Sequence, residues 1–263
     1  MKKLFENIHV DHEFADWVKS LTGCDGGNLQ GEYYFCGIEP GTGGQESEPM
    51  LYITPTIPGY MTKSGLGIPS WTNIADTGGF RIDENRTKVR FDQKVAKLYL
   101  TIKKREHDLK SVGDFILNEL STREGDTFKF NLYPLSFKSH HDILWHEAHF
   151  KLTGLPTKAL YRAYCQLVRF PIFRSLVEEY SPKAVICFGR QYARDFGMAF
   201  GGQIHGYGQL PEKIASGSKK IIHLQINNKK TQLFILPFLS GVHGVNSSQE
   251  IDDYAKIIRE ASL

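Results

Sequence analysis

The sequence predicts an α/β fold, a three-layer αβα sandwich whose central sheet has four mainly parallel strands. Residues 184–188 form a continuously apolar run, which is typical of a parallel strand covered on both faces. A glycine and a helical pattern over residues 191–200 follow this run, so strand, turn and helix form one unit of a doubly wound sheet. Residues 91–105 carry apolar side chains at helical spacing, as expected of a helix that covers such a sheet.

Length and composition indicate one domain over residues 1–263, with residues 1–30 as a helical N-terminal extension. The 263 residues are 41% hydrophobic and 23% charged, the balance of a globular protein. No apolar run is long enough to cross a bilayer, and the basic N-terminus lacks the apolar segment of a signal peptide. We therefore expect a cytoplasmic protein, and a monomer. The net charge of +3 neither requires nor excludes a nucleic-acid partner.

Periodicity and turn residues place the other elements. Helical patterns cover residues 11–21, 111–120 and 157–180, and a last helix begins at Ser247 or Ser248. Strand patterns cover residues 33–36, 128–132, 221–226 and 232–236, the last two as a hairpin or strand pair joined by Asn227-Asn228. Residues 50–80 are rich in Gly, Pro and Thr, which favours a loop. Within residues 157–180 we expect a break at Pro171, inward-facing Leu160, Leu167 and Leu176, and solvent-facing Arg162, Arg169 and Arg174.

The chain turns sharply after the first strand, in the motif Gly37-Ile38-Glu39-Pro40-Gly41. Two glycines and a proline force a tight loop, so Glu39 follows a strand end directly. In open α/β sheets ligands bind outside the carboxyl ends of the strands, which makes this loop a suitable place for a catalytic carboxylate. The alternative is an ordinary turn with an exposed glutamate.

Four segments in order, GIEPG, FKFNLYPLSF, PKAVICFGRQYARDF and LFILPFLSGVHGVNSS, resemble the uracil-DNA glycosylase superfamily. That family begins its site with a Gly-x-x-Pro-Gly-type loop, reads the base with an Asn at a later strand end and closes with a Pro-x-x-Ser loop. The resemblance spans residues 33–248. It implies a DNA glycosylase that cleaves the N-glycosidic bond of a damaged or modified, uracil-type base flipped out of single- or double-stranded DNA. We expect no cofactor.

The resemblance also assigns roles to residues. Glu39 stands where the family carries Asp or Asn, and it would stabilise positive charge that develops on the sugar. Asn131 would read the base, because an amide offers a donor and an acceptor. Phe238 stands where the family has His or Asn, so His243 in the same loop becomes the second catalytic candidate. The further predicted substrate contacts are Gly37, Ile38, Pro40, Gly41, Tyr52, Phe238, Ser240 and Gly241. We expect Glu39, Asn131, Ser240 and His243 to line one cleft.

Alternatives stay open for several of these residues. Glu46 is a second candidate acid, and Tyr60 or Trp71 offers a stacking ring in place of Tyr52. Asn131 is also interpretable as a turn cap, and His243 as a plain loop histidine. The basic run at residues 103–105 suits either the end of a helix dipole or a contact with nucleic acid.

Two other functions also fit the sequence. One is a binding module that senses modified nucleic acid without cleaving it, which Phe238 favours. The other is a metal-assisted hydrolase, in which a cluster of four histidines, His140, His141, His146 and His149, would bind the metal. Their spacing, however, is not that of the zinc motif H-E-x-x-H. Cys24, Cys36, Cys165 and Cys187 show no C-x-x-C pair, so we expect buried reduced thiols rather than an iron–sulfur cluster.

Overall fold

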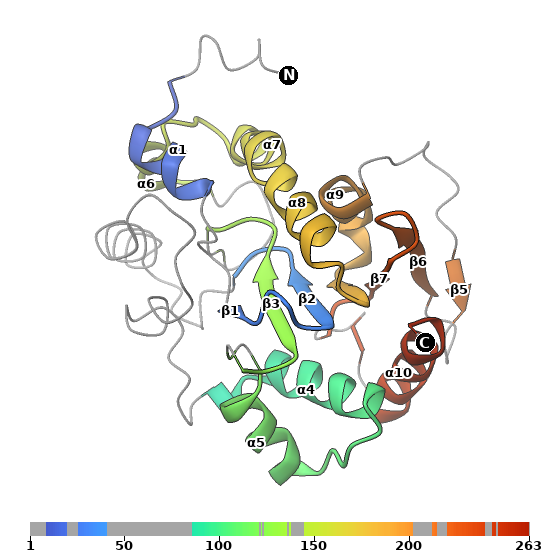
Figure 1. Cartoon of the computed structure of the whole chain (residues 1–263). Coiled ribbons are helices and arrows are strands. Elements are labelled where there is room, and N and C mark those ends of the chain that lie inside the picture. The colour runs from blue at the N-terminus through green and yellow to red at the C-terminus, as the bar shows by residue number, and fades with distance from the viewer. Residues whose placement is uncertain are drawn as a thin grey trace. The chain divides into compact units, whose positions relative to one another are not determined.

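The computed structural model describes residues 9–19, 26–40, 86–120, 122, 124–135, 137, 145–201, 212–214, 220–239, 244–245 and 247–262 (Figure 1). The chain forms two compact units. Unit 1 comprises Met1–Cys24, Ile38–Phe80 and Asn131–Phe173, and unit 2 comprises Asp25–Gly37, Arg81–Phe130 and Arg174–Leu263. The single domain expected from the sequence stays a prediction.

The strands form one mixed α/β sheet with the order β1-β3-β2-β4-β7-β6-β5. They are β1 (Gly26–Gly27), β2 (Tyr33–Gly37), β3 (Thr127–Asn131), β4 (Ala184–Phe188), β5 (Glu212–Ile214), β6 (Lys220–Ile226) and β7 (Thr231–Leu236). β4 runs parallel to both β2 and β7. The pairs β1/β3, β5/β6 and β6/β7 are antiparallel, so the predicted four-stranded, mainly parallel sheet is not what the chain forms.

A tight turn explains why the sheet is mixed. Asn227, Asn228 and Lys229 all have positive φ, of 49°, 53° and 67°. Consecutive residues in this conformation form the turn that matches the twist of a hairpin, and Asn tolerates it best among residues with side chains. The turn returns the chain along β7 and adds antiparallel β6 to it, which confirms the predicted hairpin.

The parallel strands end together at one edge of the sheet. Cys36 of β2 lies opposite Cys187 of β4, and Cys187 lies opposite Ile235 of β7. From β2 the chain continues to β3 on one side and later to β4 on the other. This divergence is a topological switch point, the place where doubly wound sheets bind ligands.

Side chains of unit 2 alternate between the two faces of the sheet, because successive strand residues point in opposite directions. Tyr33 and Phe35 belong to a buried cluster with α4 (Arg90–Ile102), α5 (Leu109–Asn118) and α10 (Ser248–Ala261), and Figure 1 shows these helices on one side of the sheet. Tyr34 points the other way and packs on Phe128 and Phe130. Phe130 in turn contacts Phe200 in the π-helical segment Gly197–Gly201, which follows α9 (Ala193–Phe196). Hydrophobic layers therefore cover both faces.

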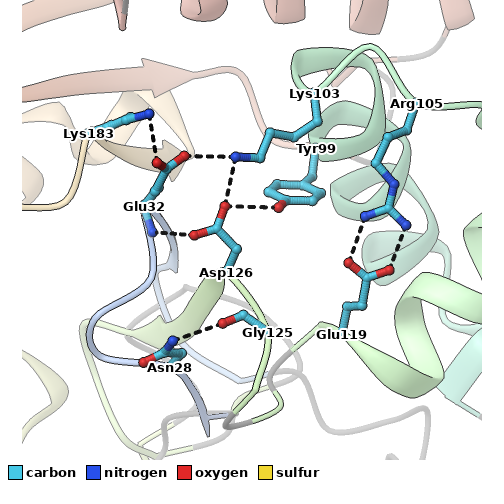
Figure 2. Close-up of polar contacts among 9 residues, drawn as sticks. All are labelled: Asn28, Glu32, Tyr99, Lys103, Arg105, Glu119, Gly125, Asp126 and Lys183. Atoms are coloured by element: carbon cyan, nitrogen blue, oxygen red, sulfur yellow. Dashed lines mark hydrogen bonds and ion pairs between the residues drawn. The ribbon is translucent and has the colours of Figure 1, made fainter.

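The basic run at the end of α4 takes part in ion pairs with unit 2 carboxylates. Figure 2 shows Lys103 between Glu32 and Asp126, at N–O distances of 2.7 and 2.8 Å. The hydroxyl of Tyr99 donates to Asp126, and Arg105 forms two hydrogen bonds of 2.6 Å with Glu119. Lys103 and Arg105 are thus held by acids of the fold itself, which argues against the nucleic-acid interpretation of this run.

Apart from the last residue of β3, the regular elements described in unit 1 are helices. Its helices are α1 (His12–Val18), α6 (Glu147–Thr153), α7 (Lys158–Val168) and the beginning of α8 (Phe170–Tyr180). The carboxylate of Asp11 caps α1 by accepting the N–H of Phe14 at 3.0 Å, and the Phe14 ring packs on Tyr161 and Tyr164 of α7. The predicted helix near residues 11–21 is confirmed over residues 12–18.

The remaining helix predictions are confirmed with small shifts in their ends, except that the helix predicted over residues 191–200 is divided into a 3₁₀ turn, the four-residue helix α9 and the π-helical segment Gly197–Gly201. Thr157 caps α7 through a hydrogen bond with the N–H of Leu160, and Pro171 lies in the first turn of α8, where a missing N–H costs least. Ser247 caps α10 in a capping box with Glu250. Short 3₁₀ turns lie at Arg86–Lys88 and Arg190–Tyr192. The predicted loop over residues 50–80 lies outside the described residues. Within the described residues, no helix is both long and apolar enough to cross a membrane.

Candidate functional site

Backbone hydrogen bonds join the loop that carries Glu39 to the segment that follows Asn131, and both segments belong to unit 1. The N–H of Tyr133 donates to the carbonyl of Ile38 at 2.8 Å, and the N–H of Phe137 donates to the carbonyl of Pro40 at 3.1 Å. Asn131 is the last residue of β3 and is half-buried. The structure therefore brings the backbone segments of the two main predicted site residues side by side.

Glu39 is buried in an ion cluster on α7. Its Oε1 lies 3.2 Å from the ammonium of Lys158, and its Oε2 lies 3.6 Å from a guanidinium nitrogen of Arg162. The side chains of Glu39, Lys158 and Arg162 are 8%, 0% and 18% exposed. Lys158 also lies 3.5 Å above the centre of the Phe137 ring. The alternative interpretation of Glu39 as an exposed turn residue is therefore wrong.

The two oxygens of Glu39 differ in their surroundings. Oε1 accepts a hydrogen bond from Lys158, whereas buried Oε2 has no hydrogen-bond donor among the described residues. Burial raises the pKa of Glu39 above its usual value, because a charged carboxylate loses hydration, and the charges of Lys158 and Arg162 oppose this rise. A carboxyl group of this kind is anchored on one side and accepts a proton more readily than a solvated one.

One face of α7 holds both segments of the site. Apart from Lys158 and Arg162, two of its side chains and that of Arg169, the residue directly after the helix, form hydrogen bonds with the segment after β3. The hydroxyl of Tyr161 accepts the N–H of Leu135 at 3.0 Å, the amide of Gln166 donates to the Tyr133 hydroxyl at 3.1 Å, and the guanidinium of Arg169 donates to the Leu132 carbonyl at 3.0 Å.

This arrangement corrects the predicted orientation of the helix. Arg169, predicted to face solvent, is fully buried, and Arg162 and Arg174 are partly buried. Leu160 and Leu167 lie half-buried, whereas Leu176 is buried as predicted. The inward side chains of α7 meet polar groups of the loop, namely a carboxylate, a hydroxyl and a backbone N–H, and Arg169 just beyond the helix meets backbone carbonyls. Buried polar groups of this kind need hydrogen-bond partners. The sequence does contain a pattern that indicates this polar inward face, because residues other than leucine recur three or four positions apart along one side of the helix. These residues are Lys158, Tyr161, Arg162, Cys165, Gln166 and Arg169.

The closing loop belongs to unit 2 and begins just after β7. Phe238 is 43% exposed, and its ring lies 5.7 Å from that of Phe91. The N–H of Val245 donates to the Phe238 carbonyl at 2.9 Å, and the ammonium of Lys94 donates to the carbonyls of Leu239 and Val245. The two ends of the loop are therefore joined to each other and to α4.

Several predicted site residues lie outside the described residues. They are Gly41, Tyr52, Ser240, Gly241 and His243, together with the alternatives Glu46, Tyr60 and Trp71.

His146 and His149, the described histidines of the cluster, cap a helix and pack against aromatic rings. The His149 ring is stacked with Phe137 and Trp145, with centroids 5.1 and 4.8 Å away. Its Nδ1 accepts the backbone N–H of His146 at 3.1 Å and so closes a capping box at the start of α6. Burial, with the nearby His146 and Lys158, lowers the pKa of His149 to about 4. The ring is therefore neutral at pH 7, with Nδ1 already engaged.

The described part of the chain contains no cluster of side chains suited to bind a metal ion. Within it, no three His, Cys, Asp or Glu side chains form a group suited to a metal ion, and His140 and His141 lie outside it. Cys36, Cys165 and Cys187 are buried free thiols, as predicted, and burial raises the pKa of Cys165 to about 12. Cys24 lies outside the described residues.

Comparisons with family models, with curated proteins and with solved structures find no match to this chain. The resemblance to the uracil-DNA glycosylase superfamily therefore rests on the four sequence segments alone.

Proposed function

We propose that this protein is a DNA glycosylase-like hydrolase that cleaves the N-glycosidic bond of a damaged or modified, uracil-type base flipped out of DNA. The proposal combines the resemblance of the four segments with the surroundings of Glu39. It includes DNA as the partner, a monomeric and cytoplasmic protein, and a three-layer αβα arrangement, which the hydrophobic layers on both faces of the sheet support.

The observation that carries the proposal is the asymmetry of the Glu39 carboxylate. Lys158 fixes Oε1 by a hydrogen bond, which orients the group, while Oε2 has only the longer ion pair of 3.6 Å with Arg162 and no hydrogen-bond donor among the described residues. A buried carboxylate in a water-poor site stabilises a nearby positive charge more strongly than one in water does. Its raised pKa suits it to take a proton from an attacking water.

In the proposed reaction the bond between the sugar C1′ and the base nitrogen breaks, and the base leaves with the electron pair. Positive charge that builds on the sugar is stabilised by the Glu39 carboxylate. A water oxygen then bonds to C1′, and one of its protons passes to Glu39 and onward to the departed base. Asn131 recognises the base in this proposal, and His243 is the candidate that stabilises the leaving base.

A panel of modified-base oligonucleotides tests this proposal. Each single- or double-stranded oligonucleotide carries one uracil or other altered base, and alkali converts every abasic site into a strand break. We expect breaks with at least one base and none with the unmodified strand. A wild-type protein that generates no abasic site from any member of the panel would contradict the proposal.

A non-catalytic binding module is the second candidate, and the exposed Phe238 favours it. The resemblance expects a polar group at this position, whereas the structure has an exposed ring supported by Phe91. An aromatic ring stacks on bases without regard to their hydrogen-bonding groups. Selective binding of modified DNA without cleavage would identify this function. Metal analysis of the purified protein tests the remaining alternative, a metal-assisted hydrolase.

A further inference from the structure

Arg169 is a fully buried arginine, and each of its three guanidinium nitrogens lies near a backbone carbonyl of unit 1. Nε donates to the carbonyl of Leu132 at 3.0 Å and Nη1 to that of Val18 at 3.2 Å. Nη2 lies at the longer distance of 3.5 Å from the carbonyl of Asn131. A guanidinium presents several donors in one rigid plane, so it can bond to two chain segments at once.

These bonds act on the peptides next to Asn131. The Leu132 carbonyl is one residue beyond the side chain assigned to base recognition, and the Asn131 carbonyl belongs to that residue itself. The next residue, Tyr133, donates its N–H to Ile38, the neighbour of Glu39. Arg169 therefore restrains a short stretch of backbone that leads from the base-reading residue to the loop of the catalytic carboxylate.

We propose that Arg169 is a positioning residue for base recognition, which fixes the backbone at Asn131 and Leu132 so that the Asn131 amide keeps one orientation. This inference rests on the proposed function. An amide that reads hydrogen-bonding groups discriminates bases only when its donor and acceptor are held in place. Loss of Arg169 would therefore weaken base discrimination more than it slows bond cleavage.

The matched variants are Arg169→Lys and Arg174→Lys. Lysine keeps the charge of Arg169 but cannot bond to separate carbonyls in one plane. Arg174 also donates to a carbonyl, that of Met198 at 2.6 Å, but belongs to unit 2, so its substitution controls for the general effect of losing a partly buried arginine.

The first measurement is amide hydrogen exchange, which needs no activity. In Arg169→Lys we expect the N–H of Tyr133 to exchange about tenfold faster, as for the loss of a hydrogen bond to a charged donor. The N–H groups of strand β4 should be unchanged, and Arg174→Lys should not affect Tyr133. Unchanged exchange at Tyr133, or the same acceleration throughout the chain, would overturn the positioning role.

The second measurement is the ratio of kcat/KM for the preferred base to that for a base with different hydrogen-bonding groups. We expect Arg169→Lys to reduce this ratio about tenfold, mainly through KM for the preferred base, with kcat changed less than threefold. An unchanged ratio overturns the inference even if activity falls. If the wild type cleaves no base, the proposed function is wrong, and so is the role of Arg169 in base recognition. The rate of hydrogen exchange at Tyr133 still decides whether Arg169 fixes the backbone at Asn131 and Leu132.

Discussion

Replacing Glu39 by Gln tests the residue on which the proposed chemistry depends. Gln has the same shape but no charge, and its side-chain oxygen can still accept the hydrogen bond from Lys158. The substitution therefore removes the negative charge beside Arg162, which in the proposed complex also faces the sugar, and keeps the packing of the loop. Because the charge is needed most in the transition state, we expect the rate of cleavage to fall and the affinity for DNA to stay nearly constant.

The structure gives the expected magnitudes. Loss of one preorganised electrostatic group lowers catalytic rates by about 10²–10³-fold. Glu39 and Lys158 are both almost fully buried, and removal of one member of a buried ion pair costs about 3–5 kcal/mol of folding free energy. Gln retains one hydrogen bond, so we expect the free energy of unfolding to fall by about 3 kcal/mol. A domain with about 5–15 kcal/mol of stability remains folded after such a loss.

The assay is single-turnover cleavage of the preferred oligonucleotide, with the protein in excess and the rate calculated per folded molecule. Urea unfolding measures stability in parallel. The matched control is Glu147→Gln, which removes the carboxylate of an exposed ion pair with Lys151 in the same unit, 2.8 Å apart. We expect the control to change neither cleavage nor stability measurably.

A double substitution separates the two effects. In Glu39→Gln combined with Lys158→Met both charges disappear, so the loss of stability should be smaller than the sum of the two single losses. Cleavage should remain as low as in Glu39→Gln. Equal cleavage by the wild type and Glu39→Gln would remove Glu39 from the mechanism and direct attention to Glu46 or His243. A binding module shows no cleavage in either protein, and its affinity for DNA is unchanged or slightly higher without the carboxylate.

Two further predictions concern stability. The pKa of His149 is about 4 in the folded chain and 6.5 in the reference state, so its neutral form stabilises the fold fully above pH 6.5, and this stability falls as the pH drops toward 4, by at most about 3 kcal/mol. His149→Gln keeps an acceptor for the capping box and should flatten the dependence of unfolding free energy on pH; an unchanged slope would contradict the assignment. Gly154 ends α6 with φ of 72°, and a Cβ there would lie 2.3 Å from the carbonyl oxygen of His9. Gly154→Ala should therefore lose more than about 1 kcal/mol in urea unfolding, whereas Gly113→Ala, where a Cβ meets open space within a helix, should be neutral or stabilising.

The sequence alone determined the elements whose causes are local. The apolar run at β4, the alternation before Asn131 and the Asn-Asn turn between β6 and β7 depend on neighbours within a few residues, as do the caps at Thr157 and Ser247. Periodicity and turn chemistry are written in consecutive residues, so these elements were predicted with small errors at their ends. The motif around Glu39 was also readable, because glycines and a proline mark a loop wherever they occur.

Only the tertiary structure decided what surrounds that motif. Glu39 and Lys158 are 119 positions apart, and Arg169 meets Val18 across 151 positions. Hydrophobic periodicity assigns leucines to the inside of α7, but the surface that α7 covers carries polar groups, among them the Glu39 carboxylate, the Tyr133 hydroxyl and the Leu135 N–H. A buried polar or charged group without a partner costs more than a half-exposed leucine does, so the polar face of α7 lies inward. No local pattern reveals which backbone a helix will face, because that depends on where the rest of the chain has folded.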